Sequence, residues 1–180
     1  KDAITIVCIG QNTSDTIHVE PAGTLPELVG DKEAIVNLTL TGYLNGTDIK
    51  FIRSLTNLQR LDISGARIVE GGDKYYESYL TADDVTGDYM FYNLPNLTRL
   101  VLSNHTTEIA PAALNSCTGL TEMEIPASVK SVGKAVFNGC NQLLLIDWNA
   151  QATITAESFD TPAKMGNLLI FAPEGAECTY

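Results

Sequence analysis

The sequence predicts a mixed α/β solenoid, a stack of short units with a parallel sheet on one face and short helices or turns on the other. Two observations predict it. An apolar pattern recurs at a constant spacing, and 44% of the 180 residues are hydrophobic, enough to fill a core. The net charge of −11 argues against nucleic acid as a partner, because binding phosphates needs clustered cations. No apolar run approaches the ~20 residues of a membrane span.

The recurring pattern has the form LxxLxL and occurs five times. Its starts are 23, 39, 23 and 23 residues apart, at Ile35, Leu58, Leu97, Leu120 and Leu143. The wide spacing equals one regular unit plus an insertion of 16 residues, which we place at about residues 69–84. A weaker sixth start lies near Leu168. Because one strand alone cannot bury these side chains, the units must stack, with neighbouring strands ~4.8 Å apart.

The second half of each unit repeats as well. Counted from the first apolar residue of the pattern, position 18 is held by Ile52, Leu114 and Phe137, and position 21 by Leu55, Cys117 and Cys140. In the unit with the insertion, counted back from the next start, Phe91 and Leu94 hold these positions. We therefore expect a second apolar segment in each unit that faces the same core. The two cysteines should then stack one unit apart, at a spacing that a disulfide could bridge.

One unit carries a more specific signature. Residues 120–142 combine a strand with a following Pro126, then Val132-Gly133, then Ala135 two residues before Phe137, then Gly139-Cys140. This order resembles the BspA-like leucine-rich repeats of bacterial surface antigens. Residues 97–119 match with Leu114 in place of the aromatic ring, whereas the two earlier units lack the proline and the cysteine. The resemblance covers roughly residues 34–173.

The resemblance implies a leucine-rich-repeat solenoid that serves as an exported, surface-exposed and non-catalytic binding module. It also implies that position 21 is a buried small residue, so we expect Cys117 and Cys140 to be reduced core thiols. Anchoring in an outer membrane, or secretion, is the location expected for such a protein. The chain begins at Lys1 rather than at a methionine, so we expect a mature or trimmed chain whose targeting signal has been removed.

Both ends of an open solenoid need caps. We assign residues 1–33 to an N-terminal cap made of a hairpin, with strands at residues 3–9 and 16–20, and a short helix. Thr24 and Glu27 predict a capping box for this helix, and Gly30 would end it. Residues 34–180 form the solenoid. Its last strand is expected at residues 168–173, and residues 164–180 are a candidate cover for Leu145.

Strand alternation turns positions 3 and 5 of each unit outward. The candidate ligand-binding residues are Arg60, Asp62, Arg99, Val101, Glu122, Glu124, Leu145 and Asp147. Arg99 and Glu122 should form an exposed cross-strand ion pair. Glu124 and Asp147 could approach the ~5 Å separation of a retaining glycosidase pair, which makes a hydrolase one alternative. An open sheet, however, does not exclude water or raise a carboxyl pKa by burial.

The insertion contributes the second candidate surface, Tyr75, Tyr76 and Tyr79. These rings either contact a partner, since tyrosine offers a large area at low entropic cost, or fold back over the neighbouring unit. The loop is also acidic, and carboxylate oxygens suit calcium, but the spacing typical of calcium loops is missing. We therefore expect a solvated acidic loop and no metal site.

No cofactor or nucleotide motif occurs, and with two histidines and no CxxC pair a zinc site is not expected. The sequence thus favours a non-enzymatic adhesion module of a cell-surface or secreted protein. Its partner would be a host protein or a glycan bound on the outward sheet face, with further domains of the same chain as additional neighbours. A passive spacer that only displays other domains is the remaining alternative.

Overall fold

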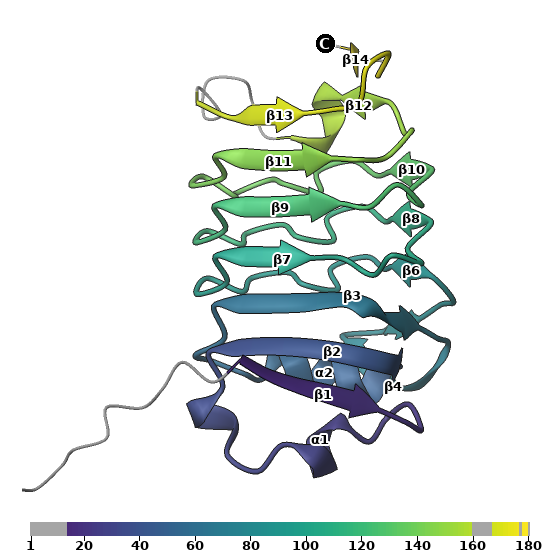
Figure 1. Cartoon of the computed structure of the whole chain (residues 1–180), viewed down its shortest axis with the longest axis vertical. Helices are drawn as coiled ribbons and strands as arrows, with labels where there is room; N and C mark the ends of the chain where they lie inside the picture. The colour runs from purple at the N-terminus through teal and green to yellow at the C-terminus, as the bar shows by residue number, and fades with distance from the viewer. Residues whose placement is uncertain (1–13, 160–166, 177, 180) are drawn as a thin grey trace, which may run out of the picture.

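The structure is a computed structural model that describes residues 14–159, 167–176 and 178–179. Its main element is a seven-stranded parallel sheet in the order β1-β2-β3-β7-β9-β11-β13 (Figure 1). The strands are β1 (Ser14–Val19), β2 (Asn37–Leu44), β3 (Arg60–Ile68), β7 (Arg99–Val101), β9 (Glu122–Ile125), β11 (Leu145–Trp148) and β13 (Leu169–Phe171). Strands β2, β3, β7, β9 and β11 each begin two residues after a repeat start, so the leucine-rich-repeat solenoid is confirmed.

The core lies between this sheet and the opposite side of the stack. All four side chains expected at position 18 are fully buried, including Phe137, whose ring stacks on Phe159 with centroids 5.1 Å apart. Cys117 and Cys140 are buried and free, as expected. Trp148 occupies the same strand position as Leu40 in the first unit, and its indole Nε1 donates to the Ala152 carbonyl at 3.2 Å.

The opposite side is built mostly of turns. It carries a short parallel sheet of β6 (Val85–Thr86), β8 (Glu108–Ile109) and β10 (Ser131–Val132). Three turns follow, at residues 89–93, 112–116 and 135–139. Each begins and ends with a left-handed residue, and these residues recur at the repeat spacing: Tyr89, Asn93, Ala112, Ser116, Ala135 and Gly139, with φ between 54° and 75°. The regularity shows that this backbone conformation is part of the repeat.

Backbone hydrogen bonds join each turn to the next. Phe91 N donates to Ala113 O at 2.8 Å, and one unit later Leu114 N donates to Val136 O at 3.2 Å. Similar bonds connect the last turn to η2 (Ala156–Ser158), where Phe137 N donates to Ser158 O at 2.9 Å. Each turn therefore depends on its neighbour for partners of its backbone N–H and C=O groups.

The first unit instead uses a helix, α2 (Gly46–Arg53). Asn45 and Asp48 form a complete capping box at its start, and Ile49 and Ile52 are buried against the sheet. N–H groups beyond the first turn of a helix bond within it, and Asn45 accepts from Thr47 N at the start of α2, so α2 does not extend the hydrogen bonds between turns. Short helices or turns were expected on this side of the solenoid. The first unit has a helix, and the units after the insertion have turns.

The N-terminal cap differs from its expected form in the described residues. β1 pairs in parallel with β2 and so belongs to the main sheet, while the expected partner strand at residues 3–9 lies outside the described residues. Helix α1 (Leu25–Leu28) has Thr24 at its N-cap but no capping box, because the Thr24 hydroxyl donates to Pro21 O. The helix ends at Leu28 with Val29 as C-cap, before Gly30. A short 3-10 helix, η1 (Lys32–Ala34), leads into β2.

A buried carboxylate from α2 supplies the missing cap. Asp48 is 0% exposed and accepts backbone N–H groups from Gly23 at 2.6 Å, Leu25 at 3.0 Å and Asn45 at 2.9 Å. The capping-box expectation for Thr24 was therefore wrong: its hydroxyl is used as a donor, and the N–H groups on either side of it, those of Gly23 and Leu25, bond to Asp48.

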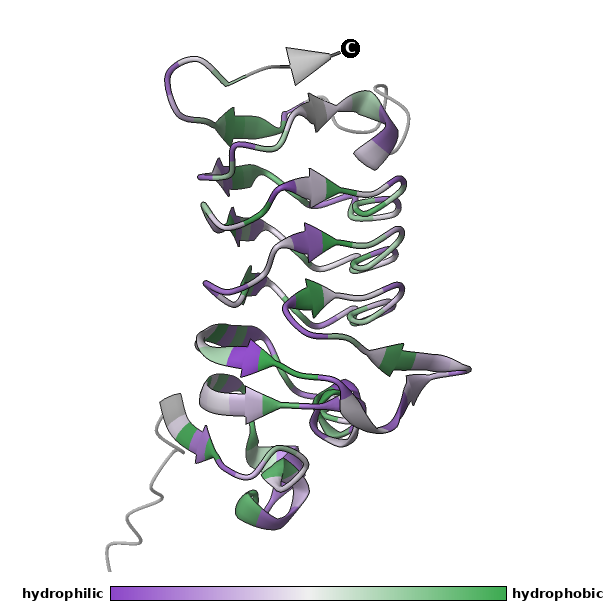
Figure 2. Cartoon of the chain, turned by 90° about the vertical axis from the view of Figure 1, so that its right-hand side faces the viewer, coloured by the Kyte–Doolittle hydropathy of each residue, from purple (hydrophilic) through white to green (hydrophobic). Residues whose placement is uncertain are grey.

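The insertion is an antiparallel hairpin of β4 (Gly71–Tyr76) and β5 (Tyr79–Thr81), which projects from the stack between β3 and the regular units (Figure 2). It lies against α2, where Asp73 N donates to Thr47 Oγ1 at 3.0 Å and the Asp73 carboxylate pairs with Lys50 at 2.9 Å. At the C-terminal end of the stack, β12 (Ile154–Thr155) pairs with β14 (Cys178–Thr179). β13 extends the sheet beside β11, so the described part of the C-terminal segment does not cover Leu145.

Candidate binding face

The outward face of the sheet consists of two columns of side chains in register. The first column runs Asn37, Arg60, Arg99, Glu122, Leu145 and Leu169. The second runs Thr39, Asp62, Val101, Glu124, Asp147 and Phe171. All eight outward residues predicted from the sequence lie in these columns, each half-buried or exposed. The structure therefore brings them together on one surface.

The face changes character along the stack. Arginines occupy β3 and β7, carboxylates dominate β9 and the second column of β11, and apolar side chains end the face on β11 and β13. Leu169 and Phe171 are 60% and 61% exposed, and they extend the apolar end that Leu145 begins. Three chemically different zones thus follow one another on a single sheet.

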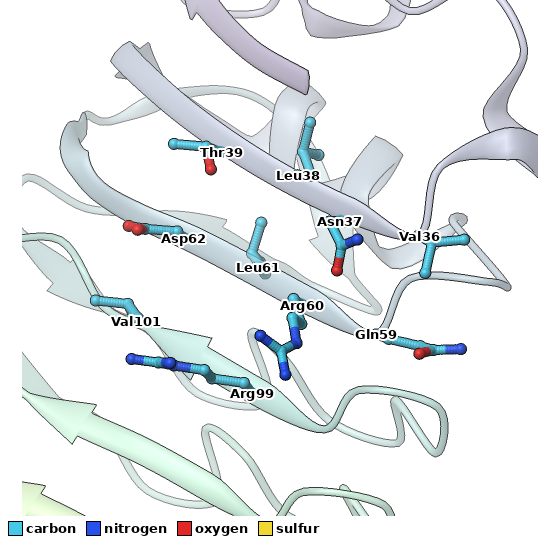
Figure 3. Close-up of a pocket in the computed structure, with 10 residues that line it drawn as sticks. All are labelled: Val36, Asn37, Leu38, Thr39, Gln59, Arg60, Leu61, Asp62, Arg99 and Val101. Carbon is cyan, nitrogen blue, oxygen red and sulfur yellow. The ribbon is translucent and has the colours of Figure 1, made fainter. Parts of the chain in front are cut away.

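A hollow of about 630 Å³ lies over β2, β3 and β7 (Figure 3). Its lining includes the outward side chains Asn37, Thr39, Arg60, Asp62, Arg99 and Val101, with Gln59 at one edge. In Figure 3 the Arg60 guanidinium extends from β3 toward β7, and the Asn37 amide points toward β3. The volume falls within the range of small-ligand sites in proteins. Of its lining, the sequence identified Arg60, Asp62, Arg99 and Val101 as candidates but gave no sign of the depression.

The predicted cross-strand pair is present. Arg99 Nη1 and Glu122 Oε2 are 3.9 Å apart, with side chains 45% and 50% exposed, so solvent screens their attraction. The Asp62 carboxylate has a hydrogen-bond partner on its own strand, since its Oδ1 accepts from Ser64 N at 2.9 Å. Among the described residues, no carboxylate lies within ion-pair distance of Arg60.

Glu124 and Asp147, the residues of the hydrolase alternative, lie directly opposite each other on β9 and β11. Glu124 is half-buried and Asp147 is exposed. Neither residue lines the hollow, which lies over other strands. Nothing in their surroundings separates an acid role from a base role, so the pair gives no support to catalysis.

The tyrosines of the insertion fold back onto the stack, the second of the two outcomes considered. Tyr75 is 4% exposed, and burial raises its pKa. Tyr76 and Tyr79 are half-buried in an aromatic cluster with Tyr89 and Tyr92, with ring centroids 5.4–6.5 Å apart. The cluster packs the hairpin onto the neighbouring turn, so these side chains are mainly structural.

Arg53, at the end of α2, has a role that sequence reasoning missed. Its Nη1 donates to the carbonyls of Tyr89, Met90 and Tyr92 at 3.0, 3.0 and 3.2 Å, and its guanidinium lies 4.6 Å from the centre of the Tyr76 ring. Burial lowers its pKa below the ordinary arginine value. No local pattern distinguishes this arginine from an exposed one, because its partners lie 36–39 residues away.

The acidic residues of the insertion also have structural partners. Arg67 binds Asp84 through two nitrogens at 2.9 and 2.7 Å, and Asp83 accepts from Glu70 N at 2.8 Å. In the part of the chain that the structure describes, no three metal-ligating side chains gather and no helix is long and apolar enough to cross a membrane.

Comparison with known proteins identifies the repeat. A family model for the BspA type leucine-rich repeat region matches residues 84–170 in six copies. Residues 84–170 belong to the BspA-type leucine-rich repeats. The part of the chain with BspA-type repeats therefore begins near β6 and includes all three turns. Such repeats are typically protein-interaction or adhesion modules of surface or secreted bacterial proteins.

A solved structure shows the same fold. The leucine-rich repeat protein of T. pallidum is similar at 16% sequence identity with a TM-score of 0.50, over 91% of this chain and 65% of that protein. At this identity the likeness concerns the fold alone, and this chain spans 65% of the other protein's length. The search among curated proteins gave no match.

Proposed function

We propose that this chain is a non-enzymatic binding module of a secreted or surface-anchored bacterial protein. It recognises a host protein or a glycan through the outward face of the seven-stranded sheet. The face carries the proposal: its two in-register columns present charged, polar and apolar groups around a hollow. In Figure 1 no described element crosses this face.

The repeat family supports the location and the type of function. Because BspA-type repeats are typical of surface and secreted bacterial proteins, we propose an outer-membrane anchor or secretion for the protein that contains this chain. The open sheet supports binding over catalysis. It leaves the carboxylates of Glu124 and Asp147 in contact with solvent, whereas an acid catalyst would need to be desolvated.

A charge-balanced pair of variants tests the face. In the face variant, Arg60, Asp62, Arg99 and Glu122 are all replaced by serine. In the control variant, Glu108, Lys130, Lys134 and Glu157 are replaced by serine, which removes the same charges from exposed sites away from the sheet. Both variants and the unchanged chain are applied to arrays of host matrix proteins and of glycans.

We expect the unchanged chain and the control variant to bind the same array features, and the face variant to bind them at least about tenfold more weakly, because its charged contacts are lost. If the face variant binds as strongly as the control, the outward sheet face is not the binding surface. If the unchanged chain binds no feature above an unrelated solenoid, the chain acts as a spacer.

A further inference from the structure

The outward face holds an unusual pair of like charges. Arg60 and Arg99 lie directly opposite each other on β3 and β7, in a chain with 11 basic and 22 acidic residues. Like charges opposite each other on neighbouring strands destabilise a sheet. Glu122 offsets the charge of Arg99 only weakly, across 3.9 Å, and among the described residues Arg60 has no ion-pair partner. A bound anion would compensate both guanidinium groups.

The surroundings limit what that anion is. Arginine binds carboxylates and phosphates through paired N–H donors. The Asp62 carboxylate, however, lines the same hollow, and Glu122 and Glu124 follow on β9. Together with the net charge of −11, these groups repel a densely charged polyanion. The site therefore suits a ligand with a single carboxylate next to neutral polar groups.

The rest of the lining indicates the neutral groups. Asn37, Gln59 and Thr39 offer amides and a hydroxyl, and Asp62 offers an acceptor, so each can hydrogen-bond a ligand hydroxyl. Among the apolar lining residues, only Val101 and Val36 reach solvent, both half-buried, and the apolar end of the face lies beyond β9. A peptide anchor of ordinary composition would need an apolar pocket that the hollow does not provide.

We propose that the hollow binds a carboxylate-bearing sugar within a glycan. Arg60 and Arg99 hold the carboxylate, and Asp62 and Asn37 hydrogen-bond the hydroxyl groups of the ring. This inference rests on the proposed function, because it specifies the ligand class for the same face.

The test titrates two acidic sugars, methyl N-acetylneuraminide and methyl glucuronide, into the 15N-labelled chain. Their methyl esters and methyl glucoside serve as uncharged controls, and a hexaglutamate peptide tests the acidic-peptide alternative. We expect saturable amide shifts confined to residues 36–39, 59–62 and 99–101 with at least one acidic sugar. Its ester should bind at least about tenfold more weakly, because the charge-assisted hydrogen bonds are lost.

Variants place the effect on the arginine pair. Arg60→Gln and Arg99→Gln should each weaken binding of the acidic sugar about tenfold. Lys130→Gln removes an equal charge from an exposed site off the face and should leave the affinity unchanged. Circular dichroism of each variant should match the unchanged chain.

Three results overturn the proposal: an ester that binds as well as its acid, shifts saturated by hexaglutamate at lower concentration than by either sugar, or no shift with any acidic sugar. If these occur while array binding still depends on the face variant, the ligand class is wrong and the proposed function stands. If array binding does not depend on the face, the proposed function itself fails.

Discussion

The first unit and the units after the insertion share the 23-residue spacing but close the back of the solenoid differently. In the first unit the eight-residue helix α2 forms its backbone hydrogen bonds within itself and with its N-cap residue Asn45. In the later units, five-residue turns take hydrogen bonds from the preceding turn and give them to the next. The same sheet spacing is therefore compatible with a self-contained unit and with units that complete one another.

The contrast explains Arg53 and Tyr75. In the later turns, carbonyls at equivalent positions accept N–H groups from the turn before, as Lys134, Val136 and Asn138 do. The corresponding carbonyls of the first turn, Asp88, Met90 and Tyr92, face α2 and the hairpin, which offer no backbone donors there. The Tyr75 hydroxyl donates to Asp88 O at 2.8 Å, and Arg53 donates to the other two. Side chains thus replace a missing turn.

The largest expected effect lies in the later units. Phe137→Ala should lower the free energy of unfolding by about 3–5 kcal/mol, because it leaves a cavity under a fully buried ring. Phe137→Leu is the matched control, since Leu114 occupies the same position one unit earlier, and it should cost about 1.5 kcal/mol or less. Urea denaturation measures both, and a loss below about 1 kcal/mol for alanine would contradict a core role.

In the first unit, the largest effect should come from a polar residue. Asp48→Ala leaves three backbone N–H groups without their acceptor, so we expect a loss of about 3 kcal/mol in unfolding free energy. The control Asp147→Ala removes an exposed carboxylate and should change stability by less than about 0.5 kcal/mol. Equal effects of the two variants in urea denaturation would refute the capping role.

At the junction where α2 and the hairpin meet the first turn, Arg53→Met should lower the free energy of unfolding by about 2 kcal/mol and Tyr75→Phe by about 1 kcal/mol. Each variant removes a side-chain donor to carbonyls of the first turn. Hydrogen exchange locates the effect. Deuterium uptake should rise in residues 88–93 and stay unchanged in residues 135–139. A uniform rise over both turns would show that the side chains do not act at the junction.

The smallest effect concerns the two core thiols. Burial raises the pKa of Cys117 to about 11 and that of Cys140 to about 12, so both should resist alkylation at pH 8.5 in the folded chain and react in denaturant. The folded-state pKa values lie above the unfolded value. The stability that comes from burying the two protonated thiols is therefore complete below about pH 9 and is lost toward pH 11–12. Peptide mapping by mass spectrometry reads out each thiol, and labelling of either in the folded chain would contradict burial.

Much of the fold could be predicted from the sequence because its signal repeats. The spacing placed every strand of the regular units, the outward columns and the buried residues at position 18, and the ion pair of Arg99 with Glu122 followed from the columns. The capping box at Thr24 was wrong because a local pattern cannot show that Asp48 supplies the acceptor from another element.

The charged residues of the candidate site could be predicted from the sequence, but its shape could not. Alternation placed Arg60 and Arg99 outward, yet 39 residues and a hairpin separate them in the chain, and nothing in the spacing showed a hollow beside them. For the tyrosines, composition left two outcomes open, a partner surface or packing onto the neighbouring unit. The structure shows the second for Tyr75, which is buried and whose hydroxyl donates to the Asp88 carbonyl.

The ladder between turns also bears on how such a chain changes length. Each turn donates N–H groups to the turn after it and accepts at its carbonyls from the turn before, and both sets of positions recur with the repeat, so the turns of successive units fit one another in the same way. Duplication or loss of a whole 23-residue segment after the first turn would leave every backbone bond paired. The first turn is the exception, because Arg53 and Tyr75 fit one neighbour only. Evolution can lengthen this solenoid beyond the arginine pair while the distance between Arg60 and Arg99 stays fixed.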